Sequence, residues 1–348
     1  MYLYRLGKLP GQQSMIVFHA LARMGQEGVI LVSPARPIVS IGYFQDTRKV
    51  ADLDYCRAHG ISVMRREIGG GTTFLDENQI FFQLVMRRDN PAFPRKIAAL
   101  YELVAGPCVD TYRDLGVDAA FRPVNDVITR DGRKVSGLGG ADIGECMVFV
   151  GNIILDFDYR SMASILKVPS EKFRDKVHKS LEENLTTTLR ETGKIPPRRE
   201  VEDLLAKHFA ARVGPLEEVP LGAEVLEAAR QLEKEFMRDE FLFKKGKARE
   251  DYVKIAEGVS VLEQNYKAPG GLITVTCAVS NGAIRDISLS GDFTFYPREM
   301  LGSLEEALAG VRREAAEVEQ AIGGFYQNFG IDSPGVTPAD FATAICAG

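Results

Sequence analysis

Residues 65–76 read Arg65-Arg66-Glu67-Ile68-Gly69-Gly70-Gly71-Thr72-Thr73-Phe74-Leu75-Asp76. Three successive glycines leave a length of backbone without side chains, so its N–H groups can close around an anion such as phosphate. Residues 60–64 and 80–86 on either side have the short apolar pattern of β-strands. The loop therefore joins two strands and leads into no helix, which argues against a Walker loop or a dinucleotide fingerprint. A plain glycine-rich hairpin connection is the alternative interpretation, because glycines cluster at turns.

A second group of polar residues lies on a predicted hairpin. Residues 124–129 and 133–140 form two strands joined by an Asp-Gly turn. This pairing brings Asn125 and Asp126 close to Lys134. A lysine opposite an Asn-Asp pair is suited to hold a phosphate or carboxylate oxygen. A solvated hairpin lysine is the alternative interpretation.

The composition is that of a globular protein. The chain has 348 residues, enough for two domains, with 45% hydrophobic and 26% charged residues. The net charge of −5 and the lack of a basic run argue against broad binding to nucleic acid or to an anionic membrane. The first residues lack the apolar core of a secretion signal, and the apolar run at 147–155 is too short to span a bilayer. We therefore expect a cytoplasmic protein.

The cysteines and histidines suggest no metal site. The five cysteines are scattered and odd in number, and the four histidines lack metal-ligand spacing. We expect most of the cysteines to be buried apolar residues in a reducing compartment. They are Cys56, Cys108, Cys146, Cys277 and Cys346.

The remaining pattern predicts two domains of mixed α and β structure. Ser170 is suited to cap a helix over residues 171–191, and Asn281-Gly282 is the turn of a strong hairpin over residues 271–292. We place the domain boundary in the lysine-rich region 243–252. Further helices are predicted at 12–26, 50–59, 96–115, 200–211, 221–240, 303–322 and 337–346, and further strands at 28–32, 37–42 and 148–157.

Several of these stretches together resemble one family, the lipoate-protein ligases of the biotin/lipoyl protein ligase and octanoyltransferase superfamily. Its first signature is matched by Arg65-Arg66, the three glycines, Thr72-Thr73, Phe74 and Asp76, and its second by Asn125-Asp126 followed by Lys134-Val135-Ser136-Gly137. The resemblance covers nearly the whole chain. It also includes Ile41-Gly42 with Gln45, residues 151–155, and the C-terminal stretches 290–293 and 304–311.

The resemblance implies a fold and a reaction. The fold is an α/β catalytic domain built on a mixed sheet over residues 1–245, followed by a small α+β accessory domain over residues 246–348. In the reaction, lipoate and ATP, with Mg²⁺, give lipoyl-AMP and pyrophosphate, and a lysine of an acceptor protein then displaces AMP. The acceptor is a lipoyl domain, a glycine-cleavage H protein or an H-protein-like lipoate-binding protein, and the enzyme is expected to be a monomer.

The same resemblance assigns roles to residues. Lys134 is implied as the catalytic residue, in contact with the lipoyl carbonyl and the phosphate. Carboxylate attack on phosphate brings two anions together, so cations and loop amides must neutralise and position them. Asp126 is a candidate magnesium ligand, with an ordinary strand-edge carboxylate as the alternative. The implied nucleotide-binding residues are Arg66, Gly69, Gly70, Gly71, Thr72, Thr73, Phe74, Asp76, Asn125, Ser136 and Gly137.

The chain also departs from the family pattern. Ile68 replaces a common serine, Leu75 a histidine, and Phe149-Val150 a histidine pair, while Glu182-Glu183 stands in a usually basic stretch. These changes indicate a divergent subfamily, and the apolar replacements can reshape an acyl tunnel. Lipoate and octanoate both remain possible substrates, since each is an apolar chain ending in carboxylate.

Three other functions are alternatives to this one. Octanoyltransferases of the superfamily use a cysteine thiolate, but residues 122–133 contain no cysteine, and Cys146 lies one residue from the position used in another branch. A one-residue slip turns a strand side chain to the opposite face, so we expect Cys146 to be structural. A non-catalytic lipoyl-domain binding protein is the second alternative. Biotin ligase is the third and is disfavoured, because its arginine-rich glycine motif with a tryptophan is missing.

Overall fold

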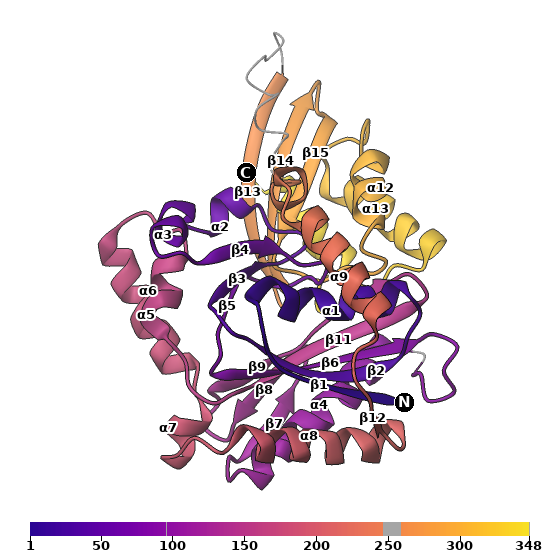
Figure 1. Cartoon of the computed structure of the whole chain (residues 1–348). Coiled ribbons are helices and arrows are strands. Elements are labelled where there is room, and N and C mark those ends of the chain that lie inside the picture. The colour runs from indigo at the N-terminus through magenta and orange to yellow at the C-terminus, as the bar shows by residue number, and fades with distance from the viewer. Residues whose placement is uncertain (95, 246–258, 348) are drawn as a thin grey trace. The chain divides into compact units, whose positions relative to one another are not determined.

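The computed structural model describes residues 1–94, 96–245 and 259–347 of the chain (Figure 1). Its internal contacts divide the chain into two compact units. The domain boundary expected within residues 243–252 lies largely outside the described residues. The first unit comprises Met1–Ser40, Ala51–Arg66 and Thr73–Arg238, and the second comprises Ile41–Val50, Glu67–Thr72 and the chain from Asp239 onward.

The first unit is built on a mixed six-stranded sheet with the strand order β10-β11-β6-β2-β1-β12. Strand β1 runs parallel to β2 and to β12, whereas the other neighbours are antiparallel. This is the mixed sheet expected from the sequence. The strands are β1 (Tyr2–Leu9), β2 (Gly28–Pro34), β6 (Gln79–Arg87), β10 (Gly139–Ile143), β11 (Cys146–Ile154) and β12 (Glu217–Glu218).

Helices cover both faces of this sheet (Figure 1). Helices α1 (Gly11–Arg23) and α9 (Ala223–Phe236) pack together over one face, and α4 (Ile97–Asp114) and α8 (Arg198–Val213) over the other. Side chains alternate between faces along a strand. The Gln83 amide accordingly donates to the Ser14 carbonyl of α1 at 2.8 Å, whereas the ring of the preceding residue, Phe82, packs against Phe209 of α8 on the other face. The core therefore has an apolar layer on each side of the sheet.

Two three-stranded sheets carry the motifs that the sequence singled out. In one, β3 (Ile38–Ile41) lies between β4 (Ser62–Arg65) and β5 (Thr73–Leu75). The glycine loop therefore joins two strands that are not neighbours and is not a hairpin connection. In the other, β8 (Asp126–Thr129) lies between β7 (Ala119–Arg122) and β9 (Lys134–Gly137), which confirms the predicted lysine hairpin.

Helix α6 (Glu171–Asn184) begins as predicted and ends early. The Ser170 hydroxyl accepts a hydrogen bond from the Phe173 N–H at 3.4 Å, which is the expected cap. The helix stops before Leu185, which takes an extended conformation and forms a parallel bridge with Lys134. The single helix predicted to residue 191 is therefore wrong, because this pairing interrupts it. The other short helices of this unit are α3 (Leu53–Ala58), α5 (Tyr159–Ile165) and α7 (Thr188–Thr192).

The second unit is a small α+β structure with its own core. Its antiparallel sheet has the order β13-β14-β15, and the turn at Asn281 and Gly282 has positive φ angles of 53° and 75°, as the Asn-Gly hairpin requires. The helix predicted over residues 303–322 is instead two helices. The elements are α2 (Thr47–Val50), α10 (Asp239–Leu242), β13 (Val259–Ala268), β14 (Gly271–Ser280), β15 (Ala283–Gly291), α12 (Met300–Ala307), α13 (Ala315–Phe329) and α14 (Pro338–Cys346).

Candidate active site

The lysine hairpin of the first unit places a cation against a carboxylate. Lys134 Nζ lies 2.6 Å from Asp126 Oδ1, and Arg122 Nη2 lies 2.8 Å from Asp126 Oδ2. Burial alone would raise the pKa of Asp126, but the charges and hydrogen bonds of Lys134 and Arg122 outweigh burial and lower the pKa below its usual value. Asp126 is therefore an anion that holds the Lys134 ammonium in place.

Asn125 and Gly137 shape the hairpin around Lys134. The Asn125 amide donates to the Leu138 carbonyl at 3.0 Å, and the Leu138 N–H returns a bond to the Asn125 carbonyl at 2.7 Å. A Cβ atom at Gly137 would lie 2.9 Å from Lys134 Nζ. Glycine at this position therefore lets the ammonium lie close to the backbone, and Asn125 fixes the strand ends rather than the lysine itself.

A buried chain of hydrogen bonds links this hairpin to the strand that follows the glycine loop. The Ser136 hydroxyl donates to Asn152 Oδ1 at 2.9 Å, and Asn152 Nδ2 donates to Gln79 Oε1 at 2.9 Å. Gln79 Nε2 then donates to the Phe74 carbonyl at 3.1 Å and more weakly to Asp76 Oδ1 at 3.4 Å. The side-chain donors all point the same way, from the lysine hairpin to Asp76, and the Asn152 backbone N–H donates back to the Ser136 hydroxyl at 3.3 Å. We call Ser136, Asn152 and Gln79 the polar relay.

Register explains why the relay forms. Asn152 on β11 faces Phe81 on β6, and Gln79 lies two residues from Phe81, so the two amides are diagonal neighbours on one face. Sequence reasoning missed Gln79 and assigned no role to the side chain of Asn152. Their only sequence signal is an amide side chain in a mostly apolar strand, and the partner of each amide is known only once the sheet register is known.

Arg66 and Thr73 both contact Ser40 of β3. Arg66 Nη1 donates to the Ser40 carbonyl at 2.8 Å, and the Thr73 hydroxyl donates to the same oxygen at 3.3 Å. Burial, together with the charge of Arg65, lowers the pKa of Arg66 to about 10, so its guanidinium is still charged at neutral pH. Burial also raises the pKa of Asp76, although its bonds to Asn78 and Gln79 oppose that shift.

The glycine loop, here residues Glu67–Thr72, belongs to the second unit and packs closely against other residues of that unit. The Gly70 N–H donates to the Phe293 carbonyl at 3.4 Å, and a Cβ atom at Gly69 would lie 2.8 Å from that carbonyl. At Gly71 the nearest atom to an added Cβ is 3.8 Å away, so there the backbone has more room. The Thr72 hydroxyl donates to Gln45 Oε1 at 3.1 Å. Close backbone approach therefore requires glycine at position 69.

An ion pair anchors the start of the same loop. Arg298 Nη2 lies 2.8 Å from Glu67 Oε1, and the two side chains are 15% and 5% exposed. The Arg298 guanidinium also lies over the Tyr43 ring, 5.2 Å from its centroid. The C-terminal part of the chain thus supplies a buried cation beside the glycine loop, which sequence reasoning did not anticipate.

The departures from the family pattern are mostly buried apolar side chains. Ile68, Leu75 and Phe149 are each less than 5% exposed. Phe149 packs edge-on against Tyr101, with ring centroids 5.2 Å apart. These replacements therefore contribute to the core of their units.

The described residues hold no ready-made metal site. Within residues 1–94, 96–245 and 259–347, no group of three or more His, Cys, Asp or Glu side chains is arranged to hold a metal ion. Magnesium in nucleotide sites commonly uses only one or two carboxylates, together with phosphate oxygens. Asp126 fits that role chemically, but each of its oxygens is bound by a cation. Each oxygen keeps a second lone pair, so a metal contact at Asp126 would be made beside these two cations, whose positive charge opposes it.

The cysteine considered for thioester chemistry lies far along its strand from the relay. Cys146 is six residues before Asn152 on β11, which corresponds to about 20 Å of strand. It is buried, and burial raises the pKa of its thiol. Cys108 is nearer the hairpin, with its Sγ 3.8 Å from the Asn152 carbonyl, but burial raises the pKa of that thiol to about 12. Both thiols are therefore poor nucleophiles.

Two known protein families match this chain. A family described as the lipoyl protein ligase A/B catalytic domain matches residues 14–210, and one described as the bacterial lipoate protein ligase C-terminus matches residues 261–345.

Among the described residues, no helix combines the length and apolar character needed to cross a bilayer.

Three similar proteins illustrate the range of relatives. Octanoyltransferase LipM of Kyrpidia tusciae is 29% identical over 60% of this chain and 84% of its own. Lipoate-protein ligase LplJ of Bacillus subtilis is 24% identical over 83% of this chain and 82% of its own. The solved bipartite lipoate protein ligase of Thermoplasma acidophilum, studied with its E2 lipoyl domain, has a TM-score of 0.62 and 26% identity, covering 70% of this chain and 95% of that one. With more than half of its length matched by the catalytic family, the chain belongs to the lipoyl protein ligase A/B catalytic domain family.

Proposed function

We propose that this protein is an ATP-dependent lipoate-protein ligase. In the first step a lipoate carboxylate oxygen attacks the α-phosphate of ATP, giving lipoyl-AMP and pyrophosphate. In the second, the lysine amine of an acceptor protein attacks the lipoyl carbonyl, forming an amide and releasing AMP and a proton. We propose a lipoyl domain, an H protein or an H-protein-like lipoate-binding protein as the acceptor, and a monomer acting in the cytoplasm.

The observation that carries this proposal is the lysine hairpin. Lys134 forms an ion pair with Asp126. Residues 122–133 contain no cysteine, and Cys108 and Cys146 are buried thiols whose pKa values are raised. An ammonium held by a carboxylate is suited to neutralise the anions that meet during adenylation. The match to a lipoate ligase C-terminus over residues 261–345 supports the same assignment.

The proposed roles follow from these contacts. Lys134 contacts the lipoyl carbonyl and the α-phosphate, and the buried Arg66 contributes a second cation. Asp126, beside Lys134, is the residue that would hold the magnesium of ATP, directly or through water. When bound, that ion would neutralise phosphate charge. The other proposed nucleotide-binding residues are Gly69, Gly70, Gly71, Thr72, Thr73, Phe74, Asp76, Asn125, Ser136 and Gly137.

The test is an assay with purified protein, lipoate, Mg-ATP and an apo lipoyl acceptor. Pyrophosphate release and the mass gain of the acceptor are measured for the wild type and three variants. We expect both activities in the wild type and in Cys146→Ser, and a loss of at least a hundredfold in Lys134→Ala. Lys207→Ala is the matched control, since Lys207 also pairs with an aspartate, Asp114, at 3.1 Å, but on the surface between α4 and α8.

Octanoyl transfer is the second candidate, because the LipM relative is an octanoyltransferase. Its signature would be acceptor modification from an octanoyl-carrier thioester without ATP, abolished by a cysteine substitution. That result would refute the ligase proposal. Acceptor binding without any modification, retained in Lys134→Ala, would instead indicate a non-catalytic binding protein.

A further inference from the structure

The strand that carries Lys134 is held on both of its edges. On one edge Lys134 pairs with Ile128 of β8. On the other it forms a parallel bridge with Leu185, and the Thr186 N–H donates to the Lys134 carbonyl at 2.8 Å. Thr186 is fully buried. The segment just before α7 therefore continues the lysine hairpin as a further strand-like edge.

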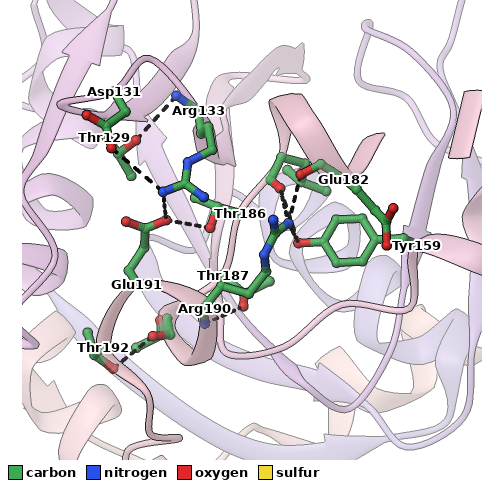
Figure 2. A network of polar contacts seen from close by, with 12 residues as sticks. Thr129, Asp131, Arg133, Tyr159, Glu182, Thr186, Thr187, Arg190, Glu191 and Thr192 are labelled. Atoms are coloured by element: carbon green, nitrogen blue, oxygen red, sulfur yellow. Dashed lines mark hydrogen bonds and ion pairs between the residues drawn. The ribbon is translucent and has the colours of Figure 1, made fainter. Parts of the chain in front are cut away.

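Glu191 on α7 ties this edge to the residue before Lys134 (Figure 2). Its Oε1 lies 2.9 Å from Arg133 Nη2 and accepts a hydrogen bond from the Thr186 hydroxyl at 2.5 Å. The Glu191 side chain is only 15% exposed. One carboxylate thus links the side chain next to Lys134 with the residue whose N–H binds the Lys134 carbonyl.

The neighbouring side chain, Arg190, points the other way (Figure 2). Its Nη1 donates to the Glu182 carbonyl at 2.9 Å, to the Leu185 carbonyl at 3.0 Å and to the Tyr159 hydroxyl at 3.0 Å. A guanidinium at the C-terminal carbonyls of α6 stabilises that helix end. Arg190 therefore fixes Leu185, the residue that pairs with Lys134.

We propose that Glu191 is a positioning residue for Lys134, acting through Arg133 and Thr186. The proposal rests on the proposed function, in which Lys134 contacts the reacting groups. Without the carboxylate, the edge formed by Leu185 and Thr186 loosens and the Lys134 ammonium samples positions away from Asp126. A displacement of about 1 Å in a catalytic group can cost on the order of a hundredfold in rate.

Two variants isolate the two contacts of Glu191. Glu191→Gln keeps the size of the side chain and an acceptor for Thr186 but removes the charge that pairs with Arg133. Thr186→Val removes the hydroxyl but keeps the N–H that binds the Lys134 carbonyl. Asp131→Asn is the matched control, because Asp131 also faces Arg133, at 3.8 Å, but is 76% exposed (Figure 2).

The kinetic test separates positioning from binding. We expect Glu191→Gln to lower kcat for lipoylation about tenfold or more, with KM for lipoate changed by less than about twofold. Thr186→Val should lower kcat in the same direction, and Asp131→Asn should leave both constants at the wild-type values. A higher KM with unchanged kcat would overturn the proposal, since it would mean that Glu191 affects substrate binding only.

Hydrogen exchange gives a readout that does not depend on activity. The Thr186 amide, which donates to the Lys134 carbonyl, should exchange at least about tenfold faster in Glu191→Gln than in the wild type or in Asp131→Asn. Unchanged exchange together with unchanged kcat would refute the positioning role. If the wild type shows no ATP-dependent lipoylation, the proposed function fails, and the exchange rates still decide whether Glu191 holds this edge. If Glu191→Gln does not fold, Thr186→Val carries both measurements.

Discussion

The polar relay predicts that Asn152→Asp makes the stability of the first unit depend on pH. Asn152 donates to Gln79 Oε1 and accepts from Ser136 through its two side-chain ends. Aspartate has the same shape, and its protonated form can still donate to Gln79. Its ionised form cannot, and it places a second acceptor opposite Gln79 Oε1. Rotating the Gln79 amide does not help, because its oxygen would then face the Phe74 carbonyl and Asp76.

The magnitude follows from the burial of the relay. Gln79 and Ser136 are at most 1% exposed and Asn152 is 9% exposed. Losing one hydrogen bond costs about 1 kcal/mol, and leaving the Gln79 acceptor buried without a donor adds about 1–3 kcal/mol. The total is about 3 kcal/mol, and because it falls on the ionised form alone, it raises the pKa of the introduced carboxyl in the folded state well above its usual value.

The sign of the pH dependence follows from that raised pKa. A group whose pKa is higher in the folded state binds its proton more tightly there, so its contribution to stability is complete below the unfolded pKa and is lost as pH rises. Asn152→Asp should therefore be close to wild-type stability near pH 4 and should lose about 3 kcal/mol by pH 7.5.

Urea unfolding of the wild type and the variant between pH 4 and pH 8 measures this difference. Asn265→Asp is the control, because it is the same chemical change at an exposed position, where the side-chain oxygen accepts from the Thr274 hydroxyl at 2.7 Å and a carboxylate can do the same. We expect the control to change the free energy of unfolding by less than about 0.5 kcal/mol at every pH. A penalty for Asn152→Asp below about 1 kcal/mol at pH 7.5, or one independent of pH, would show that the relay is not a buried, directed chain.

Three further predictions use other contacts. Tyr112→Phe removes a buried hydroxyl that donates to the Val135 carbonyl at 2.6 Å and accepts from the Ile154 N–H at 2.8 Å. We expect urea unfolding to show that the free energy of unfolding falls by about 2–4 kcal/mol, and a fall below about 1 kcal/mol would contradict the account based on two hydrogen bonds. Asp126→Asn should make the free energy of unfolding depend less on pH in the acid range, as followed by circular dichroism. The lowered pKa of Asp126 gives stability that is present above its unfolded pKa and is lost as pH falls through the folded value. An unchanged dependence on pH would count against the Lys134–Asp126 pair. Burial raises the pKa of Cys108 to about 12 and the pKa values of Cys56 and Cys277 to about 11. Alkylation of the native protein at pH 8, followed by peptide mass spectrometry, should therefore label the partly exposed Cys346 first. Early labelling of Cys108 would contradict this prediction.

The sequence predicts local contacts well. The Asp-Gly turn sets the hairpin register, so the pairing of Lys134 with Asp126 could be predicted before the structure was known. The Asn281-Gly282 hairpin is confirmed for the same reason. In both cases the interacting residues are separated only by a short turn.

Contacts between distant segments could not be predicted in this way. Gln79 and Asn152 are 73 residues apart, and their pairing depends on which strands are neighbours and in what register. The role of Glu191 was hidden because the local pattern predicts a continuous helix to residue 191, whereas pairing of Leu185 with Lys134 interrupts it. Periodicity likewise gives no sign that β3 separates the two strands that flank the glycine loop.

The glycine loop has a consequence for any attempt to shorten the chain. The polypeptide passes between the two compact units five times, so the units are interleaved along the sequence. A fragment ending at Arg238 would keep residues 41–50 and 67–72 but lose their packing partners. The ring of Phe44, now 1% exposed and stacked on Phe293, would be uncovered, and Glu67 would lose Arg298. Such a fragment would expose apolar surface and invite aggregation, so separating the two units requires redesign of both loops.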